Sequence, residues 1–139
     1  MIPQFTEPVE QALHSALTLA RSSHHTEICE LHLLHALYED QNGYFSAITS
    51  TVQIDPKRVY QLVTEALKHL PTYEGSIQEP KISLSLQKNL MQASQLAKSW
   101  NDTFVASDHI FMTFLQEMIE PLSSLRKEKH ISLDTIQFV

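Results

Sequence analysis

The chain has 139 residues, of which 42% are hydrophobic and 19% charged, enough for one domain with its own core. Its net charge of −6, with ten scattered Lys and Arg residues, excludes the basic face that nucleic-acid or membrane-surface partners need. No apolar run approaches the roughly 20 residues of a membrane span, and the first residues lack the features of a signal peptide. The single cysteine, Cys29, fits a reducing compartment. We therefore expect one cytoplasmic domain over residues 1–139.

Only two glycines occur, and helix-forming residues dominate, so the composition predicts an all-α protein. Capping signals and apolar periods predict helices over about 7–22, 31–40, 44–50 and from Pro56 onward. They then predict helices over about 84–100 and 107–117, a break at Pro121 and a short helix after Ser132. Residues 71–82 hold Gly75 and two prolines without an apolar period, which indicates a linker.

The apolar spacing of residues 26–37 returns in residues 103–114, at the offset of 77 that separates His32 from His109. The same offset pairs Leu13 with Leu90, Ala16 with Ala93, Leu19 with Leu96, Ala20 with Ala97, and Ile48 with Leu125. A constant offset over this length predicts a duplicated unit whose copies stack on each other's apolar faces. Repeat one is expected at about 5–70 and repeat two at about 83–139.

Cys29, His32 and His35 lie three residues apart, a spacing that invites a metal hypothesis. The duplicate argues against it, because apolar Ala106 and Met112 stand at the positions of Cys29 and His35. We predict core roles and no metal. His32 and His109, present in both copies, are interpreted as packing residues that bond a nearby backbone carbonyl, whereas His24 and His25 are expected to be exposed at a helix end.

Catalytic motifs are missing from the sequence. No serine lies in a G-x-S-x-G elbow, and Cys29 has no motif that marks a nucleophile. The two glycines, Gly43 and Gly75, are too far apart to form a phosphate-binding loop. We therefore predict no catalytic residues, no ATPase site and no cofactor in this chain.

Each unit has a capped helix that ends in an A-x-x-L-A pattern, followed by a helix led by histidine. The matching residues are Thr6, Ala16 to Ala20, His32 to Leu34 with Ala36 and Leu37, and in the second unit Ala93 to Ala97 and His109 to Phe111. From about Phe5 to Ile136 the chain resembles the Clp N-terminal domain. The connector from Leu70 to Gly75, with Ser83 to Ser85, looks most like the ClpB disaggregase branch, although the ClpA and ClpC branches share the domain.

The resemblance implies an eight-helix domain made of two four-helix repeats related by a pseudo-twofold axis. Such a domain stands at the front of a homohexameric AAA+ chaperone whose ATPase rings, with their ATP and Mg²⁺, lie outside this chain. The isolated domain would be a monomer. The implied function is capture of unfolded or aggregated polypeptides by a ClpB-type disaggregase, or alternatively docking of an adaptor protein in a ClpA- or ClpC-type protease.

The resemblance also places an apolar groove beside a threonine and two acidic residues, which by motif position are Thr6, Asp102 and Asp108. Groove positions Leu90 and Leu96 are apolar, while Gln92 and His109 stand where the family often has leucine, so a more polar groove is expected. Local capping would also explain Thr6 and Asp108, but no capping role is indicated for Asp102. A third class, a free-standing small-molecule or metal protein, stays open, and a Walker motif encoded beyond Val139 would exclude it.

Overall fold

The computed structural model describes residues 4–76 and 79–128. Within them lie the helices α1 (Glu7–Ser22), α2 (Glu30–Glu39), α3 (Tyr44–Thr51), α4 (Pro56–Leu67), α5 (Leu84–Ser99), α6 (Ser107–Gln116) and α7 (Leu122–Glu128), and the short strands β1 (Glu27–Ile28) and β2 (Lys81–Ile82). The predicted all-α class is confirmed, with predicted and observed helices agreeing to within about two residues. Helix α7 was not predicted, and the helix expected after Ser132 falls outside the described residues.

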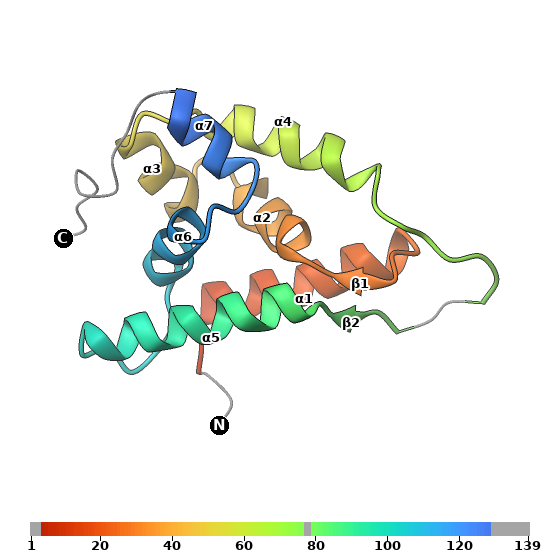
Figure 1. The fold of residues 1–139 in the computed structure, drawn as a ribbon, viewed down its shortest axis with the longest axis horizontal. Coiled ribbons are helices and arrows are strands. Elements are labelled where there is room, and N and C mark those ends of the chain that lie inside the picture. The colour runs from red at the N-terminus through yellow and green to blue at the C-terminus, as the bar shows by residue number, and fades with distance from the viewer. Residues whose placement is uncertain (1–3, 77–78, 129–139) are drawn as a thin grey trace.

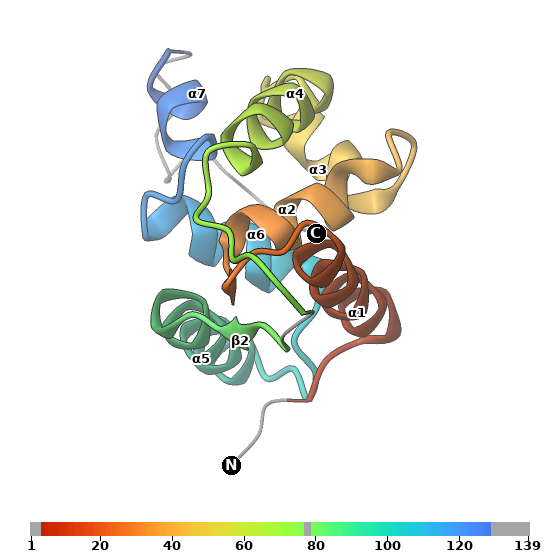
Figure 2. The same ribbon diagram turned by 90° about the vertical axis from the view of Figure 1, so that its right-hand side faces the viewer.

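The helices form three tiers, which both ribbon views show (Figures 1 and 2). Helices α1 and α5 lie side by side in the first tier, α2 and α6 occupy the centre, and α3, α4 and α7 cover the far side. Helix α2 packs against both α1 and α4, and α6 packs against α5, α3 and α7. The central pair is therefore the most buried, which agrees with its mostly apolar sequence.

Corresponding helices of the two repeats start and end 77 positions apart: α5 follows α1, and α6 follows α2, at this offset. Helix α7 lies one residue later than the same offset from α3 would place its start. The chain leaves α1 and α5 in the same way, because His24 and Asn101 both adopt positive φ angles, of 57° and 61°. The following amide, of His25 or Asp102, then bonds a helix carbonyl five residues back, which is a Schellman-type ending.

Short extended segments of one repeat pair with segments of the other. β1 pairs with β2 in parallel, with Ile28 opposite Ile82, and Phe5 forms the equivalent bridge with Val105. The pairing is reciprocal, because the Ser83 amide donates to the Ile28 carbonyl at 2.9 Å and the Thr6 amide donates to the Val105 carbonyl at 3.0 Å. The start of each repeat is thus hydrogen-bonded to the loop between the first two helices of the other repeat, so neither repeat completes its own backbone pairing.

The two central helices begin with the same hydrogen bond. His32 Nδ1 accepts the Cys29 amide at 2.9 Å, and His109 Nδ1 accepts the Ala106 amide at 2.8 Å. Both rings therefore accept the amide of the N-cap residue just before their helix, as a capping box does, and the expectation that they bond a carbonyl was wrong. The expected exposure of His25 was also wrong: only 5% of it is exposed, because its ring lies against His32.

An aromatic cluster joins the tiers at the core. Phe45 of α3 contacts both Tyr38 of α2 and Phe111 of α6 in edge-to-face geometry, with ring centroids 4.9 and 5.5 Å apart. All three rings are buried. Because Phe111 belongs to repeat two, this cluster unites the two repeats in one core. No helix in the ranges 4–76 and 79–128 has the length and apolar character needed to cross a bilayer.

Candidate functional site

The two histidines of the metal hypothesis have separate partners. His32 bonds His25, and His35 Nε2 bonds the Tyr60 hydroxyl at 3.2 Å. Burial raises the pKa of the Cys29 thiol, which disfavours the thiolate that binds metals. In the part of the chain that the structure describes, no three His, Cys, Asp or Glu side chains converge as metal ligands would. The absence of a metal stays a prediction.

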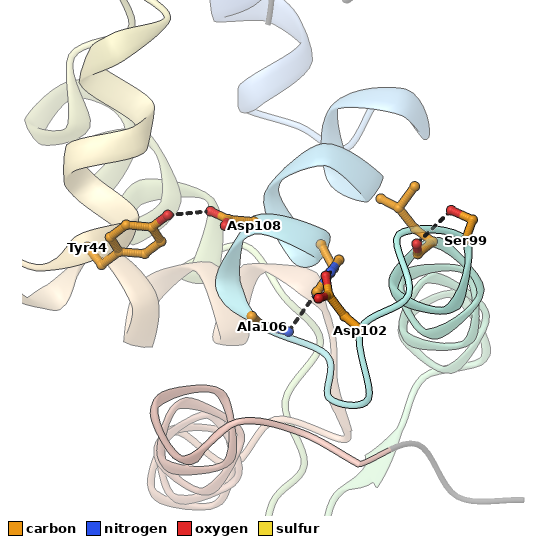
Figure 3. A network of polar contacts seen from close by, with 7 residues as sticks. Tyr44, Ser99, Asp102, Ala106 and Asp108 are labelled. Atoms are coloured by element: carbon orange, nitrogen blue, oxygen red, sulfur yellow. Dashed lines mark hydrogen bonds and ion pairs between the residues drawn. The ribbon is translucent and has the colours of Figure 1, made fainter. Parts of the chain in front are cut away.

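The most distinctive polar feature lies where the chain turns from α5 into α6 (Figure 3). We call this surface the α5–α6 corner and define it by Leu96, Trp100, Asp102, Phe104 and His109. Trp100 is 39% exposed and Phe104 is 48% exposed, although both are large apolar side chains. The Trp100 ring lies over the buried His109 ring, with centroids 5.1 Å apart. Exposed aromatic side chains beside a carboxylate are suited to binding another molecule.

Asp102 has a specific local partner that was not foreseen from the sequence. Its Oδ2 atom accepts a hydrogen bond from His109 Nε2 at 2.9 Å, while about half of its side chain remains exposed. A backbone amide can only donate, so His109 Nδ1 carries no proton in the neutral ring, and Nε2 is the donor to Asp102. The carboxylate is therefore fixed at one oxygen and open to solvent at the corner.

Asp108 lies on another side of the start of α6. Its Oδ1 accepts the Tyr44 hydroxyl at 2.8 Å, and Figure 3 shows the carboxylate directed toward α3, away from Asp102. This hydrogen bond raises the pKa of the Tyr44 hydroxyl, because ionised Tyr44 would lose its donor proton beside a carboxylate. Asp108 thus connects repeat two to α3 of repeat one.

The other predicted site residues take different positions. Thr6 is hydrogen-bonded through its backbone amide to Val105, in the segment between α5 and α6. Leu96 is partly buried near the end of α5, whereas Leu90 is only 8% exposed and belongs to the core. Thr6 and Asp102 are thus attached to the segment between α5 and α6, Leu96 lies at the end of α5, and Asp108 faces α3. A groove shared by all five residues stays a prediction.

Two clefts lie elsewhere on the described surface, and none of the five predicted residues lines either of them. One, of about 660 Å³, lies between α2, α4 and the segment into α7, and its lining combines Leu62, Ile119 and Leu125 with the charged Glu30, Arg58 and Glu120. The other, of about 280 Å³, lies between α1, α2, α3 and the start of α6.

Thr6 and its duplicate Ser83 give a matched test of capping. The Ser83 hydroxyl accepts the Leu86 amide at 3.0 Å, whereas the Thr6 side chain accepts no hydrogen bond from its helix. Ser83→Ala is therefore expected to lower the free energy of unfolding by about 1 kcal/mol, and Thr6→Ala by less than about 0.5 kcal/mol. Urea denaturation of both variants measures this difference. Equal losses would mean that Thr6 caps α1 in solution.

Comparisons with known proteins agree on the family. The family model described as the Clp repeat (R) N-terminal domain matches residues 4–129. The chaperone protein ClpB of Chlamydia pneumoniae is 33% identical over 135 residues, and that of Bacillus anthracis is 31% identical over 136 residues. Each match covers 96% of this chain, and the chain spans about 16% of the length of these relatives.

Solved structures share the fold. The Hsp104 N-terminal domain from Candida albicans superposes with a TM-score of 0.77 at 23% identity, covering 96% of this chain and 86% of that one. The N-domain of ClpV from Vibrio cholerae gives a TM-score of 0.79 at 18% identity, covering 94% and 79%. Because the family model also spans nearly all of the described residues, this chain belongs to the Clp repeat (R) N-terminal domain family.

Proposed function

We propose that this chain is the substrate-recognition domain of an ATP-dependent disaggregase of the ClpB type, and that it binds exposed apolar segments of unfolded or aggregated polypeptides. The observation that carries the proposal is the α5–α6 corner, where Trp100 and Phe104 are exposed beside the half-exposed Asp102 carboxylate. The similarity to proteins named chaperone protein ClpB supports it. Nucleotide hydrolysis would belong to the remainder of a longer protein.

The chemistry of the corner determines which segments bind. The aromatic faces would pack against apolar side chains, and Asp102 would favour a Lys or Arg next to them. An unfolded client loses conformational entropy when it is ordered, which offsets much of the apolar gain. We expect dissociation constants of about 1 to 100 µM, or roughly −8 to −5.5 kcal/mol, which allow the client to be passed on. Added salt should weaken binding because the Asp102 contact is exposed.

Asp102→Asn is the sharpest variant for testing this function. Asparagine keeps an acceptor oxygen for His109 Nε2, so the fold should be retained, whereas alanine would leave a buried N–H without its partner. The variant is expected to weaken binding of a lysine-containing apolar peptide about 3- to 10-fold and to reduce its salt dependence. Trp100 is the only tryptophan of the chain and lies at the corner, so its fluorescence can follow the titration.

The matched control is Glu65→Gln, which removes one negative charge from an exposed residue of α4, in the opposite tier. It should leave affinity unchanged. If both variants weaken binding equally, net charge and not the corner determines affinity. If Asp102→Asn binds as tightly as the unmodified chain, the corner does not bind the peptide through its carboxylate.

A second function, docking of one specific adaptor or partner peptide, is favoured by two observations. A solved neighbour with a TM-score of 0.76 is a complex of the ClpV N-domain with a VipB peptide. The resemblance to the family also implies a more polar groove here, because Gln92 and His109 stand at positions where the family often has leucine. Competition separates the two functions: unrelated unfolded proteins should displace the labelled peptide if the domain captures clients, whereas only one sequence should do so if it docks an adaptor.

A further inference from the structure

A pair of buried histidines stands in repeat one where repeat two has a histidine and a carboxylate. His25 and His32 correspond, at the offset of 77, to Asp102 and His109. His25 Nδ1 lies 2.8 Å from His32 Nε2, and the two residues are 5% and 0% exposed. The same backbone geometry therefore holds two imidazole rings in one repeat and an imidazole–carboxylate pair in the other.

The direction of each hydrogen bond follows from the first donor. The Cys29 amide donates to His32 Nδ1, so the proton of neutral His32 is on Nε2 and points to His25 Nδ1. His25 then carries its own proton on Nε2, and the backbone of Leu67 at the end of α4 favours this ring's protonated form. One series of hydrogen bonds thus joins the start of α2 to the segment after α1, next to the end of α4.

An added proton breaks this series of hydrogen bonds at one of two points. On His32 Nδ1 it faces the Cys29 amide, and on His25 Nδ1 it faces the Nε2–H of His32, so in both cases two donors oppose each other. In repeat two, a proton on His109 Nδ1 likewise opposes the Ala106 amide, but the resulting imidazolium forms an ion pair with Asp102. Repeat one loses a hydrogen bond and gains no ion pair.

The surrounding charges do not compensate. From α2, His35 acts on His32 with the same sign, and from α4 the contact is the Leu67 backbone. The nearby carboxylates are engaged elsewhere or exposed: Glu30 bonds Ser85 and Asn89, Glu65 lies by Lys68, and Glu27 faces solvent. The Arg21 guanidinium pairs with Glu79. Burial, and secondarily His25, lower the pKa of His32 to about 4, and burial also lowers the pKa of His25.

We propose that the His25–His32 pair is an acid-sensitive latch: when either ring takes up a proton, the packing of α1, α2 and α4 around the pair loosens. The His109–Asp102 pair of repeat two keeps its contact under the same conditions. The latch also holds the connector between the repeats. His25 forms an antiparallel bridge with Thr72, and the Tyr73 amide donates to the His24 carbonyl at 3.0 Å. Opening the latch would free the connector from repeat one first.

The sign of the pH dependence is fixed by linkage. His32 has a pKa of about 4 when folded and 6.5 when exposed, so the unfolded chain binds the extra proton as pH falls below 6.5. The contribution of neutral His32 to the free energy of unfolding is therefore fully present above pH 6.5, and it is lost as the pH falls toward 4. For His32 alone, the unfolding equilibrium constant should increase about 20-fold as the pH is lowered from 7 to 5.

His25→Asp tests the latch directly, because it gives repeat one the pair that repeat two has. Urea denaturation at pH 7 and pH 5 should show the rise in the unfolding constant for the unmodified chain and little of it for His25→Asp. His25→Asn is the matched control, since it offers His32 an acceptor oxygen without a charge and should keep most of the acid sensitivity. Equal pH dependence in the unmodified chain and His25→Asp would overturn the proposal.

Two further measurements keep the test decisive if His25→Asp does not fold. His32→Gln removes the titrating ring while glutamine can still reach the Cys29 amide, so it should also flatten the pH dependence. Hydrogen exchange at pH 5 should show faster opening of the His25 amide than of the corresponding Asp102 amide, which makes the equivalent bond in repeat two. Equal protection of these two amides, or an unchanged pH dependence in His32→Gln, would contradict the latch.

Discussion

Phe111→Ala is expected to lower the free energy of unfolding by about 3–5 kcal/mol, the largest effect of any substitution considered. The Phe111 side chain is fully buried in α6, and its ring contacts Phe45 of α3 at a centroid distance of 5.5 Å. Alanine would leave a cavity between the repeats, where Phe45 and Tyr38 are themselves buried and rigidly packed. The loss combines the transfer free energy of the ring with incomplete collapse of the cavity.

Urea denaturation followed by circular dichroism measures this loss. The matched control is Leu84→Ala, because Leu84 is also apolar and helical but is 82% exposed, and its truncation should cost less than about 0.5 kcal/mol. A loss for Phe111→Ala no larger than that of the control would show that the two repeats do not share one packed core.

Glu30→Ala is expected to cost about 2–3 kcal/mol, the second-largest effect, because it removes a buried acceptor between the repeats. Glu30 is the first residue of α2 and is 8% exposed. Its Oε2 accepts the Asn89 side-chain amide at 2.7 Å and also the Ser85 hydroxyl, both from α5. Without Glu30, the Asn89 amide, which is 4% exposed, loses this partner and cannot easily reach water.

Glu30→Gln is the control, since it keeps an oxygen for Asn89 and removes only the charge, and it should cost less than Glu30→Ala. A double-mutant cycle with Asn89→Ala isolates the contact: the second substitution should cost less in the Glu30→Ala background than alone. Additive losses would mean that the bond between α2 and α5 contributes nothing to stability in solution.

The duplication explains why the helices could be predicted so well. Residues such as Leu13, Ala16 and Ala20 recur with helical spacing and again at the offset of 77, so local and long-range signals agree. Helix α7 was missed because Pro121 indicated a break, although the offset that pairs Ile48 of α3 with Leu125 pointed to a helix there. Proline is compatible with a position just before a helix, and α7 begins at the next residue.

The features that could not be predicted depend on contacts between distant residues. β1 and β2 are two residues long, and no local period identifies strands that exist only because the other repeat supplies the partner. His25 was expected to be exposed from its place at a helix end, but a left-handed residue at His24 turns it inward against His32. Asp102 looked free of local roles because its partner, His109, begins the next helix. In both cases the offset of 77 relates the two pairs, which comparison of the repeats could have shown.

The measurement that tests the proposed function most directly is a chemical-shift map of the ¹⁵N-labelled chain titrated with an unfolded, lysine-containing apolar peptide. The largest perturbations are expected on the amides of Trp100, Asp102 and Phe104, and they should diminish in Asp102→Asn. Perturbations centred instead on the 660 Å³ cleft near Leu62, Ile119 and Leu125 would contradict the proposed function, because that surface shares no residue with the α5–α6 corner.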